Sequence, residues 1–310
     1  GGNSNLTYRL QYANDDLVVR RPPFGTKAKS AHSMSREYRI MKQLKPVFPT
    51  VPEVLCYSDD EAVIGSEFYV MRKVPGQLIK ERIPSQWGFT ADDTRLFCRR
   101  FWEKLVELHA VDYEAAGLGS FGKPEGYVGR QISGWNGRFV KAQTPDVDGF
   151  VDVRQWLEAT IPEESGRYSI LHGDYRIDNV VLDEDDPSQI RAVLDWEICA
   201  LGDPLMDLGS ALAYWIEEND PPQMKALLMQ PSNAPGMLTR REILDLYGEK
   251  TGLDTSEFNF YLVYGPWRVA VILQQIYYRF YHGQTADPRF RHFGAAVQNL
   301  GEHCRRRIVS

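Results

Sequence analysis

The segment at residues 172–179 constrains this chain more than any other. It begins His-Gly-Asp and places Asn179 five residues after Asp174. Two strand-like apolar stretches with a turn-forming acidic stretch between them follow at 180–194, which predicts a β-hairpin. The hairpin would return Asp195 to the side of Asn179. The sequence therefore predicts an aspartate, an amide and a second carboxylate on adjacent loops.

This combination of side chains suits phosphoryl transfer. A phosphoryl group moves through a loose transition state, so the protein mainly holds the acceptor oxygen in line and carries Mg²⁺ on the phosphates. Asp174 can accept the proton of an acceptor hydroxyl, and Asn179 and Asp195 supply the hard oxygen ligands that Mg²⁺ prefers. The D-x-x-x-x-N spacing matches part of the protein-kinase catalytic loop, with Gly173 where those enzymes carry Arg. Asp174 is the predicted catalytic residue.

Three motifs together resemble a known family. They are the His-Gly-Asp-x-x-x-x-Asn segment, the apolar-Asp-Trp-Glu segment at 194–197 and the Gly-Asp-Pro-Leu-Met-Asp-Leu segment at 202–208. They are similar to those of the aminoglycoside phosphotransferase and choline kinase superfamily. Within it the chain is most similar, from Gly1 to about Phe293, to kinase-like domains linked to acyl-CoA dehydrogenases and to their stand-alone bacterial relatives.

The resemblance implies an α+β, bilobal protein-kinase-like fold with a small antiparallel-sheet N-terminal lobe and a larger, mainly helical C-terminal lobe. Residues 1–73 would form the nucleotide-binding lobe and 74–77 the hinge. Residues 78–310 would carry the catalytic loop, the metal loop and the acceptor site. The resemblance also implies ATP and Mg²⁺ as cofactors, with GTP not excluded. Hydrophobic periodicity predicts helices at 33–44, from Thr90 onward, and at 204–217, 239–251 and 258–281.

The amino-terminal part supplies the predicted nucleotide site. Arg20 stands where protein kinases carry the phosphate-binding Lys, and Glu37 is its expected partner on the following helix. The alternative for these two residues is an ordinary surface ion pair. Small residues at the start would let backbone N–H groups approach phosphate, and the resemblance implies that the hinge contacts the adenine. These candidate contacts are Gly2, Asn3 and Ser4 for phosphate, and Met71, Arg72 and Lys73 for the adenine.

Two further residues of the central motifs have open roles. The resemblance implies that His172 is a buried residue that braces the catalytic loop, and a direct chemical role is the less favoured alternative. Glu197 either contacts a second metal ion or is simply solvated.

The acceptor site is predicted from the last long helix. Its candidate residues are Tyr264, Trp267, Arg268 and Tyr278, although an aromatic stripe on a helix is more often core. The segment 258–310 carries several arginines against Asp287 and Glu302 only. This balance favours an anionic or acyl-bearing small molecule with a hydroxyl, such as a hydroxyacyl-CoA or a hydroxy acid. The alternatives are an aminoglycoside or amino-alcohol kinase, a non-catalytic nucleotide-binding pseudokinase and, less favoured, a glycoside hydrolase.

Composition excludes several other classes. A net charge of −6 and a pI near 5.6 argue against a nucleic-acid-binding surface. The four cysteines form no C-x-x-C pair and favour neither zinc nor a disulfide framework, which predicts a cytoplasmic protein. No apolar run reaches the roughly 18 residues of a membrane span, and the Gly-rich polar start is not expected to be a signal peptide. Because the chain opens without Met, residues that include a first strand are expected upstream, and the oligomeric state is not indicated.

Overall fold

A computed structural model describes residues 5–23, 33–164 and 166–309 of the chain. The chain divides into two compact units, Gly1–Gly122 with Ile170–Ala200, and Lys123–Ser169 with Leu201–Ser310. The first unit contains both the amino-terminal sheet and the segment 172–197. The predicted lobe boundaries at residues 73 and 78 do not coincide with these units and stay a prediction, because a division by contacts does not locate a hinge.

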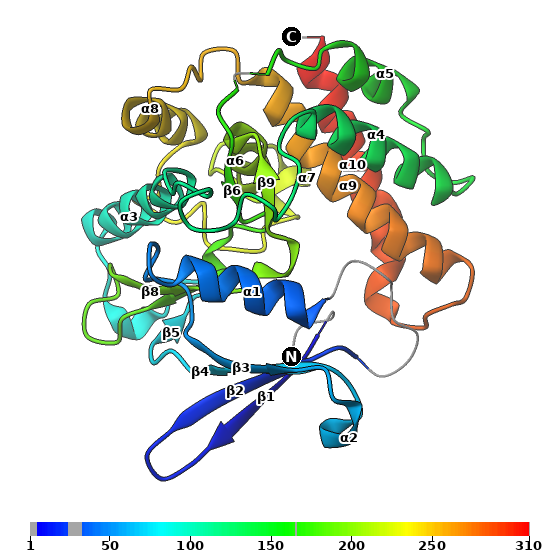
Figure 1. Cartoon of the computed structure of the whole chain (residues 1–310). Coiled ribbons are helices and arrows are strands. Elements are labelled where there is room, and N and C mark those ends of the chain that lie inside the picture. The colour runs from blue at the N-terminus through cyan, green and yellow to red at the C-terminus, as the bar shows by residue number, and fades with distance from the viewer. Residues whose placement is uncertain (1–4, 24–32, 165, 310) are drawn as a thin grey trace. The chain divides into compact units, whose positions relative to one another are not determined.

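The first unit contains a four-stranded antiparallel sheet in the order β1-β2-β4-β3. Helix α1 packs against β3 and β4 (Figure 1). Ser33 caps α1 by accepting from the Arg36 N–H, and the buried face of the helix carries Glu37 among apolar residues. A carboxylate on an apolar face needs a partner, and the sheet supplies it. These elements are β1 (Leu6–Gln11), β2 (Asp16–Arg21), α1 (Met34–Leu44), β3 (Val54–Ser58) and β4 (Phe68–Arg72).

A second, three-stranded sheet of the same unit contains the predicted hairpin. Strands β7 (Val180–Leu182) and β8 (Ile190–Val193) pair antiparallel, which confirms the hairpin, and β5 (Gln77–Leu78) pairs with β7. Gly76 has φ +140°, and a Cβ there would lie 2.3 Å from the Leu182 carbonyl oxygen. Only glycine allows this close approach of the chain to β7.

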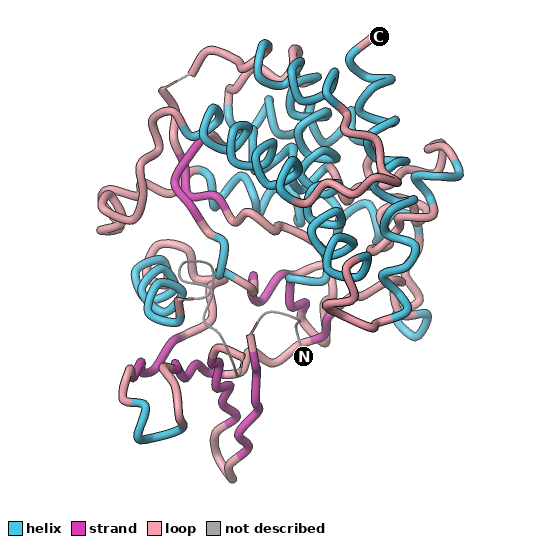
Figure 2. Tube along the Cα trace, turned by 90° about the vertical axis from the view of Figure 1, so that its right-hand side faces the viewer, coloured by secondary structure: helices cyan, strands magenta, loops and turns pink. Residues whose placement is uncertain are grey.

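The second unit is built mostly of helices (Figure 2). Helix α9 (Asn259–Tyr281) packs against α4, α6 and α10. A Cβ at Gly265 of α9 would lie 2.2 Å from the carbonyl oxygen of Gly209 in α6, so glycine lets these two helices approach closely. Helix α6 is Pro204–Leu212, shorter than the predicted 204–217, whereas the helices predicted at 239–251 and 258–281 begin one residue later than expected.

The predicted α+β class is confirmed, with a small antiparallel sheet and a larger helical part. No helix within the described ranges is long and apolar enough to cross a membrane. The remaining elements are α2 (Glu61–Ile64), the 3₁₀ turn η1 (Ser85–Trp87), α3 (Ala91–His109), α4 (Tyr127–Lys141), α5 (Val151–Ala159), β6 (Ser169–Leu171), η2 (Ile177–Asn179), η3 (Trp196–Ile198), β9 (Ala200–Gly202), α7 (Pro222–Lys225), α8 (Arg240–Thr251), η4 (Pro288–His292) and α10 (Phe293–Ile308).

Candidate active site

The loop after β6 holds Asp174 and Asn179 together. The Asn179 side-chain nitrogen donates to the Asp174 carbonyl oxygen at 2.9 Å and lies 3.3 Å from the Asp174 Oδ2. A carbonyl oxygen can only accept, so the amide nitrogen must face Asp174 and the amide oxygen must point elsewhere. That oxygen is the type of hard ligand that Mg²⁺ prefers. The amide orientation therefore fits the predicted metal ligand.

Gly173 is required by the conformation of this loop. It has φ +83°, and a Cβ there would lie 3.0 Å from the Ile198 side chain. Both the left-handed backbone and the close neighbour favour glycine. This gives a physical reason why the position of the protein-kinase arginine is occupied by glycine here.

His172 is buried and links the two predicted functional loops. Its Nδ1 accepts from the Asp174 N–H at 3.2 Å, and its Nε2 lies 2.8 Å from the Leu194 carbonyl oxygen. Since Nδ1 accepts, the proton sits on Nε2 and is donated to Leu194, which defines a neutral imidazole. His172 thus has the contacts of a bracing residue between Asp174 and the residue before Asp195.

The hairpin brings Asp195 to the side of Asn179. The Leu194 N–H donates to the Asn179 carbonyl oxygen at 2.7 Å. Asp195 itself has φ +66°, a left-handed conformation that is unusual for a residue other than glycine. Such a conformation costs on the order of 1 kcal/mol and persists where surrounding contacts fix it. The next residue, Trp196, is buried, and its indole N–H donates to the Val193 carbonyl oxygen at 2.9 Å. This contact fixes the chain directly after Asp195.

Arg20 contacts three carboxylates of the first unit. Its Nη1 lies 2.6 Å from Glu37 Oε1, so the expected ion pair is present. Its Nη2 lies 3.1 Å from Asp195 Oδ1 and 3.6 Å from Glu197 Oε2. One guanidinium therefore joins α1 to the predicted metal loop. The role of this arginine as a phosphate clamp stays a prediction.

Burial and the charge of the partner have opposite effects on the pKa of each member of the Arg20–Glu37 pair. Burial raises the pKa of the Glu37 carboxyl to about 7, although the charge of Arg20 pulls it down. Burial lowers the pKa of Arg20, but Glu37, then Tyr69 and Asp195, raise it above the ordinary value overall. Arg20 thus remains a cation, and Glu37 is the member of the pair that can take up a proton.

Sequence reasoning missed two residues of this cluster. Asn5 is 2% exposed, and its side-chain nitrogen donates to Glu197 Oε2 at 2.8 Å. Tyr69 is fully buried and stands opposite Arg20 in the β2–β4 register, and burial and then the charge of Glu37 raise the pKa of its hydroxyl. The pairing register of β2 and β4 would have identified Tyr69 as the neighbour of Arg20. A single sequence does not determine that register.

The predicted nucleotide contacts have different outcomes. Gly2, Asn3 and Ser4 lie outside the described residues. Met71 and Arg72 end β4, and Lys73 follows it. The Arg72 N–H donates to the Glu53 carbonyl oxygen and the Lys73 N–H to the Asp16 carbonyl oxygen. A base at this segment would therefore have to use carbonyl groups or the N–H groups of later residues, and the contact stays a prediction.

The predicted acceptor residues lie in the second unit, mostly in its core. Trp267 is fully buried, donates to Asn136 Oδ1 at 2.9 Å and packs on Phe139. Tyr264 and Arg268 are also buried, whereas Tyr278 is partly exposed. This burial favours packing for the first three, and acceptor contact stays a prediction for all four.

The arginine surplus of segment 258–310 is smaller than the sequence count indicates. Arg305 pairs with Asp152 at 2.5 Å and with Asp148 at 3.4 Å, two acids that lie outside that segment. Arg289 pairs with Asp287 at 2.6 Å. Counting charges within one segment misses partners that the fold brings from elsewhere.

The described residues contain no group of three or more His, Cys, Asp or Glu side chains placed to hold a metal ion by themselves. Asn179 and Asp195 would contribute one amide and one carboxylate oxygen. Mg²⁺ typically keeps several waters and completes its shell with substrate phosphates, so this small donor set is compatible with nucleotide-dependent metal binding.

Comparisons with known proteins agree with this geometry. The chain is 34% identical to acyl-CoA dehydrogenase family member 10 of Mus musculus over 97% of its length, and 32% identical to family member 11 of Gallus gallus over 97%. It spans only 28% and 39% of those two relatives. A solved Ralstonia eutropha protein, provisionally assigned as an aminoglycoside phosphotransferase, is 29% identical, with a TM-score of 0.82 and coverage of 98% of this chain and 91% of that one.

These similarities confirm the protein-kinase-like fold of this group of phosphotransferases. The model of the phosphotransferase enzyme family matches residues 1–243, a range that contains Arg20 and the whole segment 172–197. The chain therefore belongs to the phosphotransferase enzyme family.

Proposed function

We propose that this protein is an ATP-dependent kinase that transfers the γ-phosphoryl group to a hydroxyl of a small molecule. One observation carries the proposal: hydrogen bonds of His172 and of the Leu194 backbone hold the loop of Asp174 and Asn179 beside the residue that precedes Asp195. A non-catalytic nucleotide-binding module has no chemical need for all three side chains in one bonded arrangement. A glycosidase would not need the amide.

In the proposed reaction, Asp174 orients the acceptor hydroxyl and takes its proton. The bond from the acceptor oxygen to the γ-phosphorus forms while the bond from that phosphorus to the β–γ bridging oxygen breaks, and ADP leaves. Asn179 holds the Asp174 backbone and, with Asp195, would hold Mg²⁺ through its amide oxygen. When bound, Mg²⁺ reduces the negative charge of the nucleotide phosphates. Arg20 is the proposed clamp on those phosphates, and Glu37 orients it. GTP is not excluded as the donor.

We further propose that the acceptor is anionic or acyl-bearing, such as a hydroxyacyl-CoA or a hydroxy acid. Support comes from the curated relatives, which are named as acyl-CoA dehydrogenase family members. The arginines of segment 258–310 give weaker support, because Arg305 and Arg289 already have carboxylate partners. An aminoglycoside would need a carboxylate-rich pocket, since each ammonium must be paired when it loses water. An amino alcohol is the other alternative.

A cytoplasmic location of the protein stays a prediction.

The test is an acceptor screen with a matched inactive variant. The protein would be incubated with Mg²⁺-ATP and separate pools of hydroxyacyl thioesters, aminoglycosides and amino alcohols, and phosphorylated products would be followed by mass. We expect product from the first pool with the native protein and none with Asp174→Asn. Turnover of aminoglycosides alone would overturn the acceptor class, and phosphorylation that survives in Asp174→Asn would overturn the assigned mechanism.

A further inference from the structure

Helix α1 contacts the predicted metal loop through two neighbouring side chains. Glu37 reaches the loop through Arg20, whose guanidinium lies 3.1 Å from Asp195. Arg36 reaches it directly, because its Nη1 donates to the Cys199 carbonyl oxygen at 3.0 Å. Asp195 and Cys199 are the residues that flank the single turn η3. Both ends of this turn are therefore tied to α1.

The turn η3 has little stability of its own. It has three residues and no side-chain hydrogen bond at its start, and Asp195 before it has φ +66°. So short a turn makes few internal hydrogen bonds, and a left-handed aspartate costs on the order of 1 kcal/mol. The conformation of Asp195 therefore depends on contacts from outside the turn. The N–H groups of Val193 and Leu194 make such contacts on its amino-terminal side, and Arg36 makes one on its carboxyl-terminal side.

The guanidinium of Arg36 makes a second contact that suits a planar cation. Its Cζ lies 3.8 Å from the centroid of the Phe121 ring, so the group lies over this ring while it donates to the Cys199 carbonyl oxygen. Neither of these partners is a carboxylate. Arg36 is half-buried, and a cation that loses water without a carboxylate partner costs free energy. An ordinary ion pair therefore does not account for the place of Arg36.

We propose that Arg36 is a positioning residue of the phosphotransferase site. By holding the Cys199 carbonyl oxygen on α1, it keeps the turn η3, and with it Asp195, in the conformation that receives Mg²⁺. This inference rests on the proposed metal role of Asp195. Helix α1 would then position both charged parts of the site, Arg20 through Glu37 and Asp195 through Arg36.

The test measures how strongly ATP binding depends on Mg²⁺. Calorimetry with the full chain would give the affinity for ATP in excess Mg²⁺ and in EDTA, and urea unfolding would report stability in parallel. Arg36→Met keeps an unbranched side chain but removes the charge and the donor. We expect it to weaken ATP binding about tenfold with Mg²⁺, the effect of about one hydrogen bond, and less than about twofold in EDTA.

Two further variants identify the cause of such a loss. Arg39→Met makes the same change at an exposed position of α1 and should bind ATP as the native protein does. Arg36→Lys keeps the charge and a donor but not the planar group, so its loss with Mg²⁺ should be about threefold. Equal losses with and without Mg²⁺, an equal loss in Arg39→Met, or lower stability with unchanged ATP affinity would overturn the proposal. Should Arg36→Met fail to fold, the same two affinities of Arg36→Lys decide.

Asp195→Asn, measured in the same way, separates this inference from the proposed function. If Asp195→Asn lowers the Mg²⁺-dependent affinity and the Arg36 variants do not, the positioning role is wrong and the metal role of Asp195 stands. If neither substitution changes that affinity, the metal role of Asp195 is wrong, and the proposal for Arg36 fails with it.

Discussion

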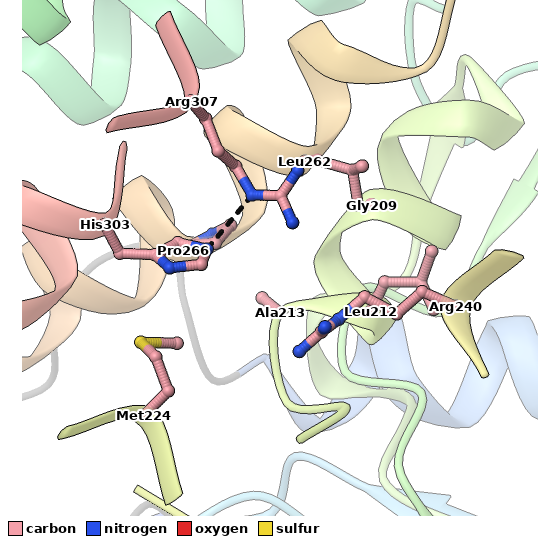
Figure 3. A pocket seen from close by; sticks show the side chains of 9 residues that line it. All are labelled: Gly209, Leu212, Ala213, Met224, Arg240, Leu262, Pro266, His303 and Arg307. Carbon is pink, nitrogen blue, oxygen red and sulfur yellow. Dashed lines mark hydrogen bonds between the residues drawn. The ribbon is translucent and has the colours of Figure 1, made fainter. Parts of the chain in front are cut away.

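The two units of this protein each contain a cluster of arginines and carboxylates, but only the cluster of the first unit has a surplus of one charge. Around Arg20, three carboxylates lie within 3.6 Å of one guanidinium. In the second unit, Arg240 and Arg307 line one small pocket (Figure 3), and Arg240 lies 2.5 Å from Asp220 and 3.5 Å from Glu217, so two carboxylates balance two arginines. A surplus of partly buried charge indicates the sign of the missing partner. The acid surplus of the first cluster favours a cation such as the Mg²⁺ of a nucleotide, whereas the balanced second cluster calls for no further charged partner.

The largest expected effect tests whether Asp174, in the first unit, is the catalytic residue. Asp174→Asn removes the group that accepts the acceptor proton, so kcat should fall by about 10²- to 10⁴-fold, the usual contribution of general base catalysis. Nucleotide affinity should change little, because Asp174 is not a proposed metal ligand. Steady-state kinetics and calorimetry with Mg²⁺-ATP would measure the two quantities.

Asp178→Asn is the matched control for this substitution. Asp178 lies in the same loop, and its side chain pairs with Arg176 instead of facing Asn179. We expect its kcat to stay within about threefold of the native value, since a partly exposed pair contributes little. Equal losses in both variants would mean that the loop needs its charge for folding and would contradict the assigned role of Asp174.

The next effect tests whether Arg20 and Glu37 act as one unit. Arg20→Ala should weaken ATP binding by about 10- to 100-fold, because it removes the proposed charge-assisted hydrogen bonds to phosphate, which contribute about 1.5–3 kcal/mol. Glu37→Ala should have a smaller effect, and the double-mutant cycle should show a coupling of about 1–3 kcal/mol. Arg9→Ala removes an exposed arginine of the same sheet and should leave binding unchanged. If the effects of Arg20→Ala and Glu37→Ala on ATP affinity are additive, Glu37 does not orient Arg20 for nucleotide binding.

A third variant tests the metal role of Asp195. Asp195→Asn keeps the shape but removes a charge, so ATP affinity measured with Mg²⁺ should fall about tenfold. ATP affinity measured with EDTA should change much less. Asp185→Asn changes an acid in the turn of the same hairpin and should not affect either value. If Asp195→Asn weakens binding equally with and without Mg²⁺, the residue acts through Arg20 and not through the metal.

The residues of the first cluster differ in how far sequence could reveal them. The proximity of Asn179 and Asp195 was predictable because the β7–β8 hairpin between them is a local structure with clear turn signals. The Asn5–Glu197 contact joins positions 192 residues apart, and no local pattern encodes it. Tyr69 depended on a strand register that periodicity does not set.

Helix α6 shows how distant contacts override local preference. Periodicity extended it to residue 217, but it ends at Leu212. The Trp215 indole donates to the Leu238 carbonyl oxygen at 2.8 Å, and Arg240 Nη2 donates to the Trp215 carbonyl oxygen at 2.5 Å. These partners lie more than 20 residues away, and they hold the segment after Leu212 in another conformation. The partners of Arg305 were missed for the same reason.

The two charge clusters should also give opposite responses of stability to pH. The pKa of Glu37 is about 7 in the folded protein, against an ordinary value of 4.5. The folded state therefore binds this proton more tightly, and stability is lost as the pH rises from about 4.5 to 7. Between pH 5 and 8, the native protein should lose about 2 kcal/mol more than Glu37→Gln, which cannot titrate. Urea unfolding at the two pH values would measure this, and equal losses in the two proteins would exclude the shift.

His303 provides the corresponding test in the cluster of the second unit, with a smaller expected effect. Its pKa is about 4 in the folded protein against an ordinary 6.5, so the unfolded chain binds the proton more tightly. Stability should therefore be lost as the pH falls from about 6.5 to 4. Burial is the largest cause of the lowered pKa, the charges of Arg307, Arg240 and Arg306 lower it further, and Asp220 opposes the shift.

His303→Gln should remove that acid-side loss and keep the hydrogen bond that His303 Nε2 accepts from Arg307 Nε at 3.1 Å, because the glutamine oxygen can also accept a hydrogen bond. Between pH 7 and 5 the native protein should lose about 1–2 kcal/mol more than this variant in urea unfolding. NMR titration of the imidazole would measure the pKa of His303 in the folded protein directly. An imidazole that titrates near 6.5 would contradict the lowered pKa and remove the difference in pH response between the two clusters.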